Sequence, residues 1–138
     1  MRPAYRTRQI VNALNLSTLL GLLVAKLLHA RLERAADGLV LARDAGGTFP
    51  RASAFTIGNV IVLREPHPSD ELLRHESHHS TQWAWCVLVF LPLYLLAAAW
   101  SWSRAGDHWS RNWFERHAGL ADGGYRENPL RAVWTRRP

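Results

Sequence analysis

RHESHHSTQW, residues 74–83, contains the pattern His-Glu-x-x-His. Residues four apart share one face of a helix, so His75 and His79 can direct their imidazoles at one ion. Neutral imidazole is a good zinc ligand, and Glu76 stands where it could act as general base on a zinc-bound water. The pattern therefore predicts a zinc site on a helix, with Glu76 as a catalytic residue. The alternative is a histidine-rich polar helix face without metal.

The residues before the pattern are typical of a helix start. Pro66 and Pro68 disfavour a helix that begins earlier. Ser69 or Asp70 can cap the helix, and Glu71 places a further acid in its first turn. Apolar residues continue the pattern beside the polar histidine face: Leu72, Leu73, Trp83 and Val87. The histidines therefore lie about two turns inside a helix.

Composition limits the class of protein. The chain has 138 residues, enough for one domain with one core. Sixteen of the 17 basic residues are arginine and the formal net charge is +6, which fits nucleic acid, an anionic membrane or simple solubility. The sequence has no recognition helix, RNA-binding aromatic signature or lysine-rich arm, so we expect no nucleic acid partner. Cys86 is the single cysteine, which excludes an intrachain disulfide and cysteine-based zinc sites.

The N-terminal 36 residues are expected to form an apolar helix. Residues 10–25 carry no charge, and the run predicts one long helix that ends before Asp37 and Gly38. Its length is close to the roughly 20 residues that cross a bilayer, with Lys26 extending toward the interface. The helix could therefore be a membrane helix or a long core helix.

Two strand signals follow. Residues 38–43 are a short strand candidate, and residues 54–63 (AFTIGNVIVL) give the best strand signal in the chain. Gly58 and Asn59 form either a bulge or a two-residue turn that divides the second stretch. We expect a small sheet before the histidine helix.

A long uncharged stretch follows the histidines. Residues 80–103 have the length of a transmembrane helix. Six tryptophans flank or follow its apolar part: Trp83, Trp85, Trp100, Trp102, Trp109 and Trp113. Tryptophan favours the membrane–water interface, although a tryptophan-rich core is the alternative. We expect association with a membrane, in bacteria the inner membrane, through residues 10–30 and 84–102.

Two histidines leave a catalytic zinc site one protein ligand short. The downstream candidates are Asp107, His108, Glu115, His117 and Asp122. His117 follows Glu115 by two residues, so on the helix predicted over residues 109–118 it faces away from it. His108 is a rival third ligand. His78 is expected to be an exposed or supporting histidine rather than an alternate ligand.

Asn112-x-x-Glu115-x-x-Ala118, together with the histidine pattern, resembles the gluzincin group of metallopeptidases. A glutamate on a later helix completes the zinc site in that group. The resemblance therefore implies His75, His79 and Glu115 as the metal ligands. The small alanine would let the later helix approach the histidine helix closely.

The resemblance covers roughly residues 55–125. It includes LPLYL at 91–95 and GGY at 123–125. With these stretches the chain is similar to small bacterial proteins that have an HExxH helix and an apolar segment containing proline and tyrosine. Many gluzincins place an aspartate directly after the alanine, where it supports a ligand histidine. That position is Gly119 here, and Asp122 is the nearest substitute.

The resemblance implies an α+β, mainly helical, minimal zincin-like fold. The strand signals place a short β-sheet before the HExxH helix, and we expect a helical hairpin and a third-ligand helix after it. The single domain would consist of an apolar segment at 1–36, a metal-site region at 37–125 and a basic tail at 126–138. The chain gives no indication of its oligomeric state.

The implied activity is zinc-dependent hydrolysis of a peptide bond in a peptide or protein substrate. Glu76 would accept the proton of the water and pass it to the leaving amine. Tyr125, or His108, would stabilise the oxyanion. The strand that ends at Leu63 would pair with the extended substrate backbone. Two other classes stay open: a zinc-stabilised, membrane-associated interaction module without catalysis, and a small membrane protein without metal.

Residues 80–103 cannot be one spanning helix if Glu115 is a ligand. Such a helix would separate His79 and Glu115 by about 30 Å of hydrocarbon. Pro92 disfavours helix at Leu91, so we expect a helical hairpin that turns there. Its arms, about 18 and 21 Å long, would return the chain to the level of the metal. Its apolar tip could enter a bilayer or pack on the first helix.

Overall fold

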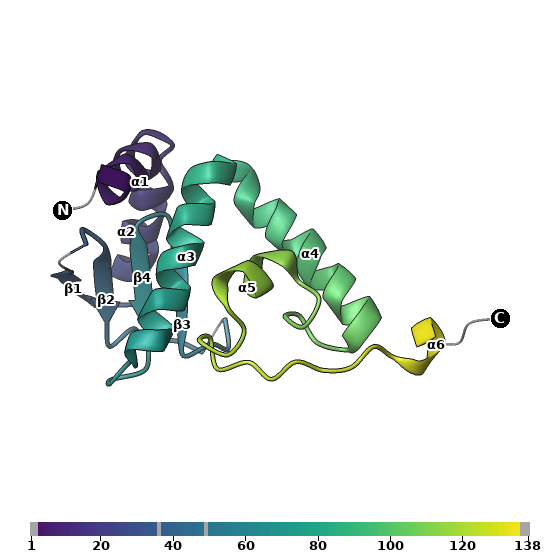
Figure 1. The fold of residues 1–138 in the computed structure, drawn as a ribbon. Coiled ribbons are helices and arrows are strands. Elements are labelled where there is room, and N and C mark those ends of the chain that lie inside the picture. The colour runs from purple at the N-terminus through teal and green to yellow at the C-terminus, as the bar shows by residue number, and fades with distance from the viewer. Residues whose placement is uncertain (1–2, 36, 49, 136–138) are drawn as a thin grey trace.

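About half of the chain is helical and four short strands form one sheet, in a computed structural model that describes residues 3–35, 37–48 and 50–135 (Figure 1). In chain order the elements are α1 (Pro3–Leu14), α2 (Ser17–Leu27), β1 (Arg31–Arg34), β2 (Val40–Arg43), β3 (Ala54–Ile57), β4 (Val60–Leu63), α3 (Asp70–Cys86), the 3-10 turn η1 (Val87–Val89), α4 (Phe90–Ala105), α5 (Trp113–Ala118) and α6 (Ala132–Thr135). The predicted α+β class, with a sheet before the histidine helix, is confirmed.

The sheet is mixed, with the strand order β1-β2-β4-β3. β2 and β4 are parallel, and the other two pairs are antiparallel. Gly58 and Asn59 form the two-residue turn between β3 and β4, and Gly58 has a φ of 59°, which glycine adopts without strain. The strand that ends at Leu63 cannot pair with a substrate as expected, because β4 already has a neighbour on each side. β3 is the edge strand on that side of the sheet.

Two helices cover the two faces of the sheet. All four residues of β4 are buried, and its side chains alternate between the faces. Val60 and Val62 pack with Ala25 of α2, whereas Ile61 packs on the other face in a cluster that Leu73 of α3 covers. A strand covered on both faces reads as a continuous apolar run, which explains the strong signal of VIVL.

The prediction of one long helix in the first 36 residues is wrong. α1 and α2 meet at a bend of 76°, Leu16 has a φ of 65° at the bend, and the chain after α2 forms β1. The Ser17 N–H donates to Asn15 Oδ1 at 2.9 Å, and the Ser17 hydroxyl donates to the Asn12 carbonyl at 3.2 Å. These polar side chains satisfy backbone groups that a continuous helix would pair, so the chain bends there without glycine or proline.

α3 begins as predicted, and the expected hairpin follows it. Ser69 Oγ accepts a hydrogen bond from the Leu72 N–H at 3.2 Å. After Val87, which has a φ of 55°, α4 runs back from the end of α3 (Figure 1). The turn is at η1, however, and not at Leu91 and Pro92. Pro92 lies in the first turn of α4, where its missing N–H needs no helical partner.

The C-terminal elements also differ from the prediction. α5 is shorter than the helix expected over residues 109–118, because Asn112 caps it: its Oδ1 accepts the Phe114 N–H at 3.0 Å. The described part of the basic tail docks on the end of α4. The Trp134 indole N–H donates to the Ser103 carbonyl at 3.0 Å, and the Arg104 guanidinium lies 4.0 Å from the Trp134 ring centroid.

Candidate metal centre

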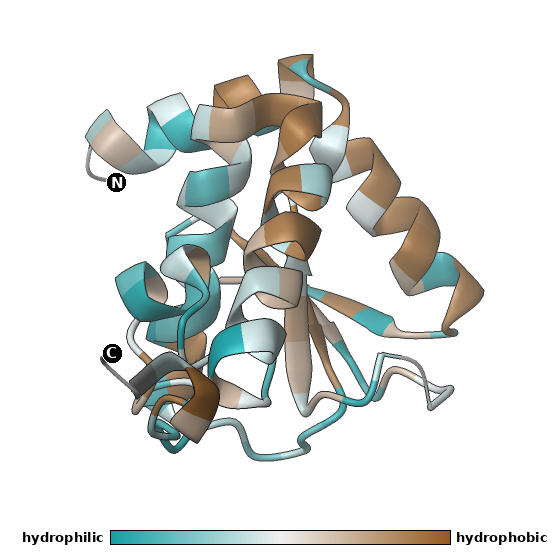
Figure 2. Cartoon of the chain, turned by 90° about the vertical axis from the view of Figure 1, so that its right-hand side faces the viewer, coloured by the Kyte–Doolittle hydropathy of each residue, from teal (hydrophilic) through white to brown (hydrophobic). Residues whose placement is uncertain are grey.

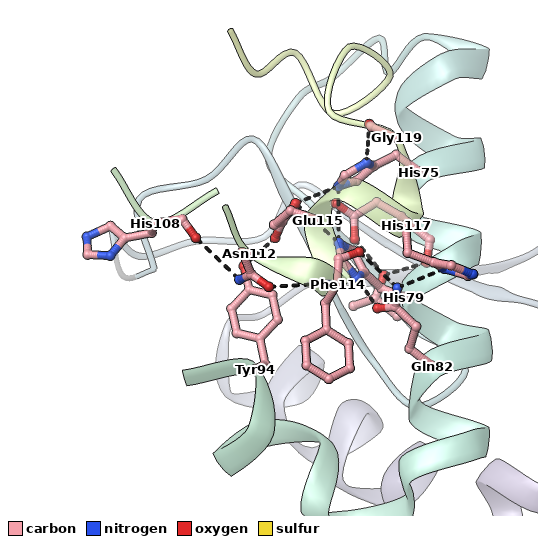
Figure 3. A network of polar contacts seen from close by, with 12 residues as sticks. His75, His79, Gln82, Tyr94, His108, Asn112, Phe114, Glu115, His117 and Gly119 are labelled. Carbon is pink, nitrogen blue, oxygen red and sulfur yellow. Dashed lines mark hydrogen bonds and ion pairs between the residues drawn. The ribbon is translucent and has the colours of Figure 1, made fainter. Parts of the chain in front are cut away.

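His75 and His79 on α3 and Glu115 on α5 converge on one point (Figure 3). The two imidazole Nε2 atoms are 3.1 Å apart. Glu115 Oε2 lies 3.2 Å from His75 Nε2 and 3.6 Å from His79 Nε2. Ligand atoms of a tetrahedral zinc ion with bonds near 2.0–2.1 Å lie about 3.3 Å apart. The three side chains therefore have the spacing of a zinc coordination shell.

Local sequence explains why these side chains meet. The two histidines are one helical turn apart on the buried face of α3. On α5, the cap at Asn112 sets the start of the helix, and Phe114, Glu115 and Ala118 are its buried residues. Ala118, whose small side chain was expected to let α5 approach α3, is buried. Glu115 is only 2% exposed, so its carboxylate is withdrawn from water.

The hydrogen bonds of the two imidazoles fix which nitrogen faces the centre. His75 Nδ1 lies 2.9 Å from the Gly119 carbonyl, which can only accept, so Nδ1 carries the proton. His79 Nδ1 lies 2.8 Å from Gln82 Oε1. The Gln82 amide is oriented by its own N–H, which donates to the Phe114 carbonyl at 2.9 Å. Both Nε2 atoms therefore present lone pairs to the centre.

Glu115 Oε2 adds a third electron-rich atom, which is buried and has no hydrogen-bond partner among the described residues. Three such atoms repel one another unless a positive charge lies between them. Burial alone would lower the pKa of His79 and raise the pKa of Glu115. Contacts between the imidazoles and the carboxylate reverse both effects, so the pKa of His79 is raised and that of Glu115 is lowered. The cluster requires a cation, either a proton or a metal ion, and its two-histidine, one-glutamate donor set fits zinc.

Tyr94 on α4 positions Glu115, the candidate third ligand, a role that sequence reasoning did not assign. Its hydroxyl donates to Glu115 Oε1, which leaves Oε2 facing the histidines (Figure 3). Burial, together with the neighbouring Glu115 carboxylate, raises the pKa of Tyr94, so its hydroxyl keeps the proton that it donates. A tyrosine inside an otherwise apolar helix is a usable signal, because a buried hydroxyl needs a partner.

Glu76 lies beside this cluster and faces β3. Its carboxyl is buried, and Oε2 accepts a hydrogen bond from the Thr56 hydroxyl at 2.6 Å. Burial raises the pKa of Glu76, although the nearby histidines and Thr56 act in the opposite direction. A carboxylate with a raised pKa is a better general base near neutral pH. The Trp83 indole N–H, which donates to the Thr56 carbonyl at 2.9 Å, joins α3 to the same strand.

Tyr125 approaches the cluster from the loop that follows α5. Its ring lies edge-on to His75 with the ring centroids 5.9 Å apart, and it stacks on Trp109 at 5.1 Å. Burial and the carboxylates of Glu115 and Glu76 raise the pKa of Tyr125, so its hydroxyl is protonated and can donate. This position suits the donor role expected for Tyr125.

Gly123 in the same loop sets how closely the backbone approaches His75. A Cβ at residue 123 would lie 2.7 Å from His75 Cε1 and 2.9 Å from each ring nitrogen. We expect Gly123→Ala to displace the imidazole. A zinc ion held by this cluster would then bind about tenfold more weakly, as after the loss of a ligand's support. Competition against a chelator measures this affinity.

Gly124→Ala is the matched control for this variant. A Cβ at residue 124 meets nothing within 4 Å, although the φ of 76° makes the substitution strained. It should therefore lower thermal stability and leave zinc affinity unchanged. Equal zinc affinities for the wild type and Gly123→Ala would show that the loop moves without disturbing His75.

The other predicted ligand candidates lie away from the cluster. His108 is exposed and stacks on Trp102 with ring centroids 5.0 Å apart, so neither a ligand nor an oxyanion role fits it (Figure 3). Asp107 accepts hydrogen bonds from the Ser110 hydroxyl and N–H, each at 2.6 Å. Two further histidines are exposed: His78, as expected, and His117.

Asp122 does not replace the aspartate that is missing after Ala118. It pairs with Arg74, whose Nε lies 3.0 Å from Oδ2. The support for His75 comes instead from the backbone carbonyl of Gly119, at the same position as the missing aspartate.

No protein-family model, curated protein or solved structure matches this chain. What the site can do is therefore inferred from its own geometry.

Proposed function

We propose that this chain is a zinc-dependent peptidase with a minimal, gluzincin-like zinc site on a zincin-like fold. One observation supports this most strongly: lone-pair atoms of His75, His79 and Glu115 converge at the spacing of a zinc shell, with the buried carboxylate of Glu76 beside them. Structural zinc sites are usually closed by four protein ligands, whereas catalytic sites have three and keep one position open. Among the described residues this group offers three.

Each residue has a separate role in hydrolysis. His75, His79 and Glu115 would hold the ion, and zinc would supply Lewis acidity that polarises a carbonyl and lowers the pKa of water. Glu76 would accept the proton of the attacking water and deliver it to the leaving amine. Tyr125 would donate a hydrogen bond to the oxyanion.

The edge strand β3 is the proposed place for an extended substrate backbone, in place of the strand that ends at Leu63. Among the described strands, β3 has a sheet neighbour on only one side. Its Thr56 already contacts Glu76, so a peptide added beside this strand would pass close to the general base.

The test compares two neighbouring histidines. Zinc content is measured by elemental analysis, and hydrolysis is measured with a fluorescently labelled unfolded protein. The wild type should carry about one zinc per chain, and His79→Ala should lose both zinc and activity, because one of three ligands is gone. His78→Ala, which changes an exposed imidazole on the same helix, should retain both. A wild-type chain that binds no zinc would rule out the proposed function.

A further inference from the structure

Two turns at one end of the molecule expose apolar side chains. α1 turns into α2 at residues 15–16, and α3 turns into α4 at η1. Both turns lie at the top of Figure 1, and in Figure 2 the same end is largely hydrophobic. We call residues 14–20 and 85–91 the apolar end. Seven of its large apolar side chains are at least 48% exposed: Leu14, Leu16, Leu19, Trp85, Leu88, Val89 and Leu91.

The apolar end carries no charged residue, and along each helix that leads away from it the first charged residue that is not buried is basic: Arg6, Lys26, Arg74 and Arg104. No charged residue occurs in residues 9–25 or 80–103. Lys26 lies nine residues after the start of α2, about 14 Å along the helix, and Arg104 lies about 21 Å along α4. Every charged residue of α1, α2 and α4 is basic, and Arg6 and Lys26 are exposed. The uncharged end is therefore bordered by cations.

We infer that the apolar end inserts into one leaflet of an anionic bilayer and that, given the proposed function, the substrate is a peptide segment at the membrane surface. An anionic bilayer fits an end that is apolar at both turns and has basic residues as the next exposed charges. Tryptophan favours the membrane–water interface. Exposed tryptophans lie on the two helices that η1 joins: Trp85 on α3, and Trp100 and Trp102 on α4.

The lengths of the elements favour insertion into one leaflet. The helical segment 70–105 contains a stretch that is apolar and long enough to cross a membrane, but η1 divides the segment into two helices. α4 has 16 residues, about 24 Å, and α2 has 11 residues, about 16 Å. Both are shorter than the hydrocarbon thickness of about 30 Å. The chain therefore enters and leaves the bilayer on the same side.

The position of the metal centre connects this insertion to a class of substrate. His79 lies seven residues before Cys86, the last residue of α3, which is about 10 Å along the helix. Inserted apolar faces reach about 5–10 Å into the boundary between headgroups and acyl chains. The ligands then lie at the level of the headgroups. Substrate segments that leave the bilayer, or lie on its surface, pass through the headgroup level. They can therefore reach the metal centre without the unfolding of a soluble domain.

Vesicle flotation of the full-length, zinc-loaded chain tests the insertion. The wild type should float with vesicles that contain anionic phosphatidylglycerol, and float less with pure phosphatidylcholine. Leu88→Glu/Val89→Glu should lower the bound fraction at least about tenfold, because a charge within the acyl chains is costly. Val133→Glu is the matched control, since Val133 is 71% exposed on α6, outside the apolar end.

Two flotation results would overturn the inference. One is a wild-type chain that stays unbound. The other is a double variant that floats like the wild type. A wild-type chain that dimerises without vesicles, and a double variant that is monomeric, would show that a second copy covers the apolar end instead.

An acylated peptide and the same peptide without the acyl chain test the substrate class. With anionic vesicles, the wild type should cleave the acylated peptide at least about tenfold faster, because both partners are confined to one surface. Leu88→Glu/Val89→Glu should lose this preference and cleave the soluble peptide at the wild-type rate. A wild-type chain that floats with the vesicles but cleaves both peptides at the same rate would overturn the substrate class. Flotation without cleavage of either peptide would overturn the proposed function and leave the membrane insertion standing.

Discussion

Glu76→Gln is expected to keep zinc bound and to reduce peptide hydrolysis by about 10²–10⁴-fold. The substitution removes the proposed proton acceptor and changes none of the three proposed ligands. The glutamine carbonyl can still accept the hydrogen bond from the Thr56 hydroxyl, which Glu76 Oε2 accepts at 2.6 Å, so the side chain should keep its position. Zinc content by elemental analysis and the rate on a labelled peptide, measured on the same preparation, check both expectations.

Glu71→Gln is the control for the Glu76 variant. Glu71 is an exposed acid in the first turn of the same helix, so the variant has the same change of charge at a distance from the ligands. It should hydrolyse the peptide at the wild-type rate. A Glu76→Gln enzyme with full activity would contradict the mechanism. A zinc-loaded wild type without hydrolysis, together with a silent Glu76→Gln substitution, would favour an interaction module that zinc only stabilises.

Glu115→Ala should lower zinc affinity by more than about 100-fold, and Tyr94→Phe by about 10–100-fold. Loss of a group that supports a ligand typically costs 10–100-fold in metal affinity, so loss of the ligand itself should cost more. Tyr94→Phe removes only the hydroxyl that donates to Glu115 Oε1 and leaves Oε2 in place. Chelator competition on the folded variants, checked by circular dichroism, gives the two affinities.

Glu127→Ala is the control for the loss of a glutamate. Glu127 is an exposed acid that pairs with Arg111 and Arg116, outside the cluster. Its removal should leave zinc affinity at the wild-type value. Full zinc affinity in Glu115→Ala would remove Glu115 from the site. Wild-type affinity in Tyr94→Phe would show that the hydroxyl does not hold the carboxylate.

The parts of the site that follow from local periodicity could be predicted from the sequence. His75 and His79 share a face because they are four residues apart in a helix whose start Ser69 marks. Glu115 came from a resemblance, and the structure places it at the histidines. The supporting groups could not be predicted in this way. Tyr94 reaches Glu115 only because α4 turns back from α3, which is a long-range property of the fold.

The N-terminal segment shows why hydropathy alone predicted neither the bend between α1 and α2 nor strand β1. Residues 10–25 contain no charge, and the one glycine, Gly21, lies within α2 rather than at the bend. The bend depends on hydrogen bonds of Asn12 and Ser17, and Asn12 also donates to the Ser80 carbonyl of α3 at 2.9 Å. All four residues of β1 are exposed, so this strand has no apolar signal and exists through its pairing with β2.

The carbonyl that holds His75 has a consequence for how such sites vary between proteins. A carboxylate in that role is lost by one substitution, whereas every residue at position 119 brings a carbonyl. What position 119 restricts is conformation, because Gly119 has a φ of 96°, which residues with a Cβ rarely adopt. The glycine at this position therefore indicates the backbone conformation. It does not indicate the hydrogen bond to the imidazole, because every residue has a backbone carbonyl. A pattern that demands an acid after Ala118 would miss a chain that supports its histidine in this way.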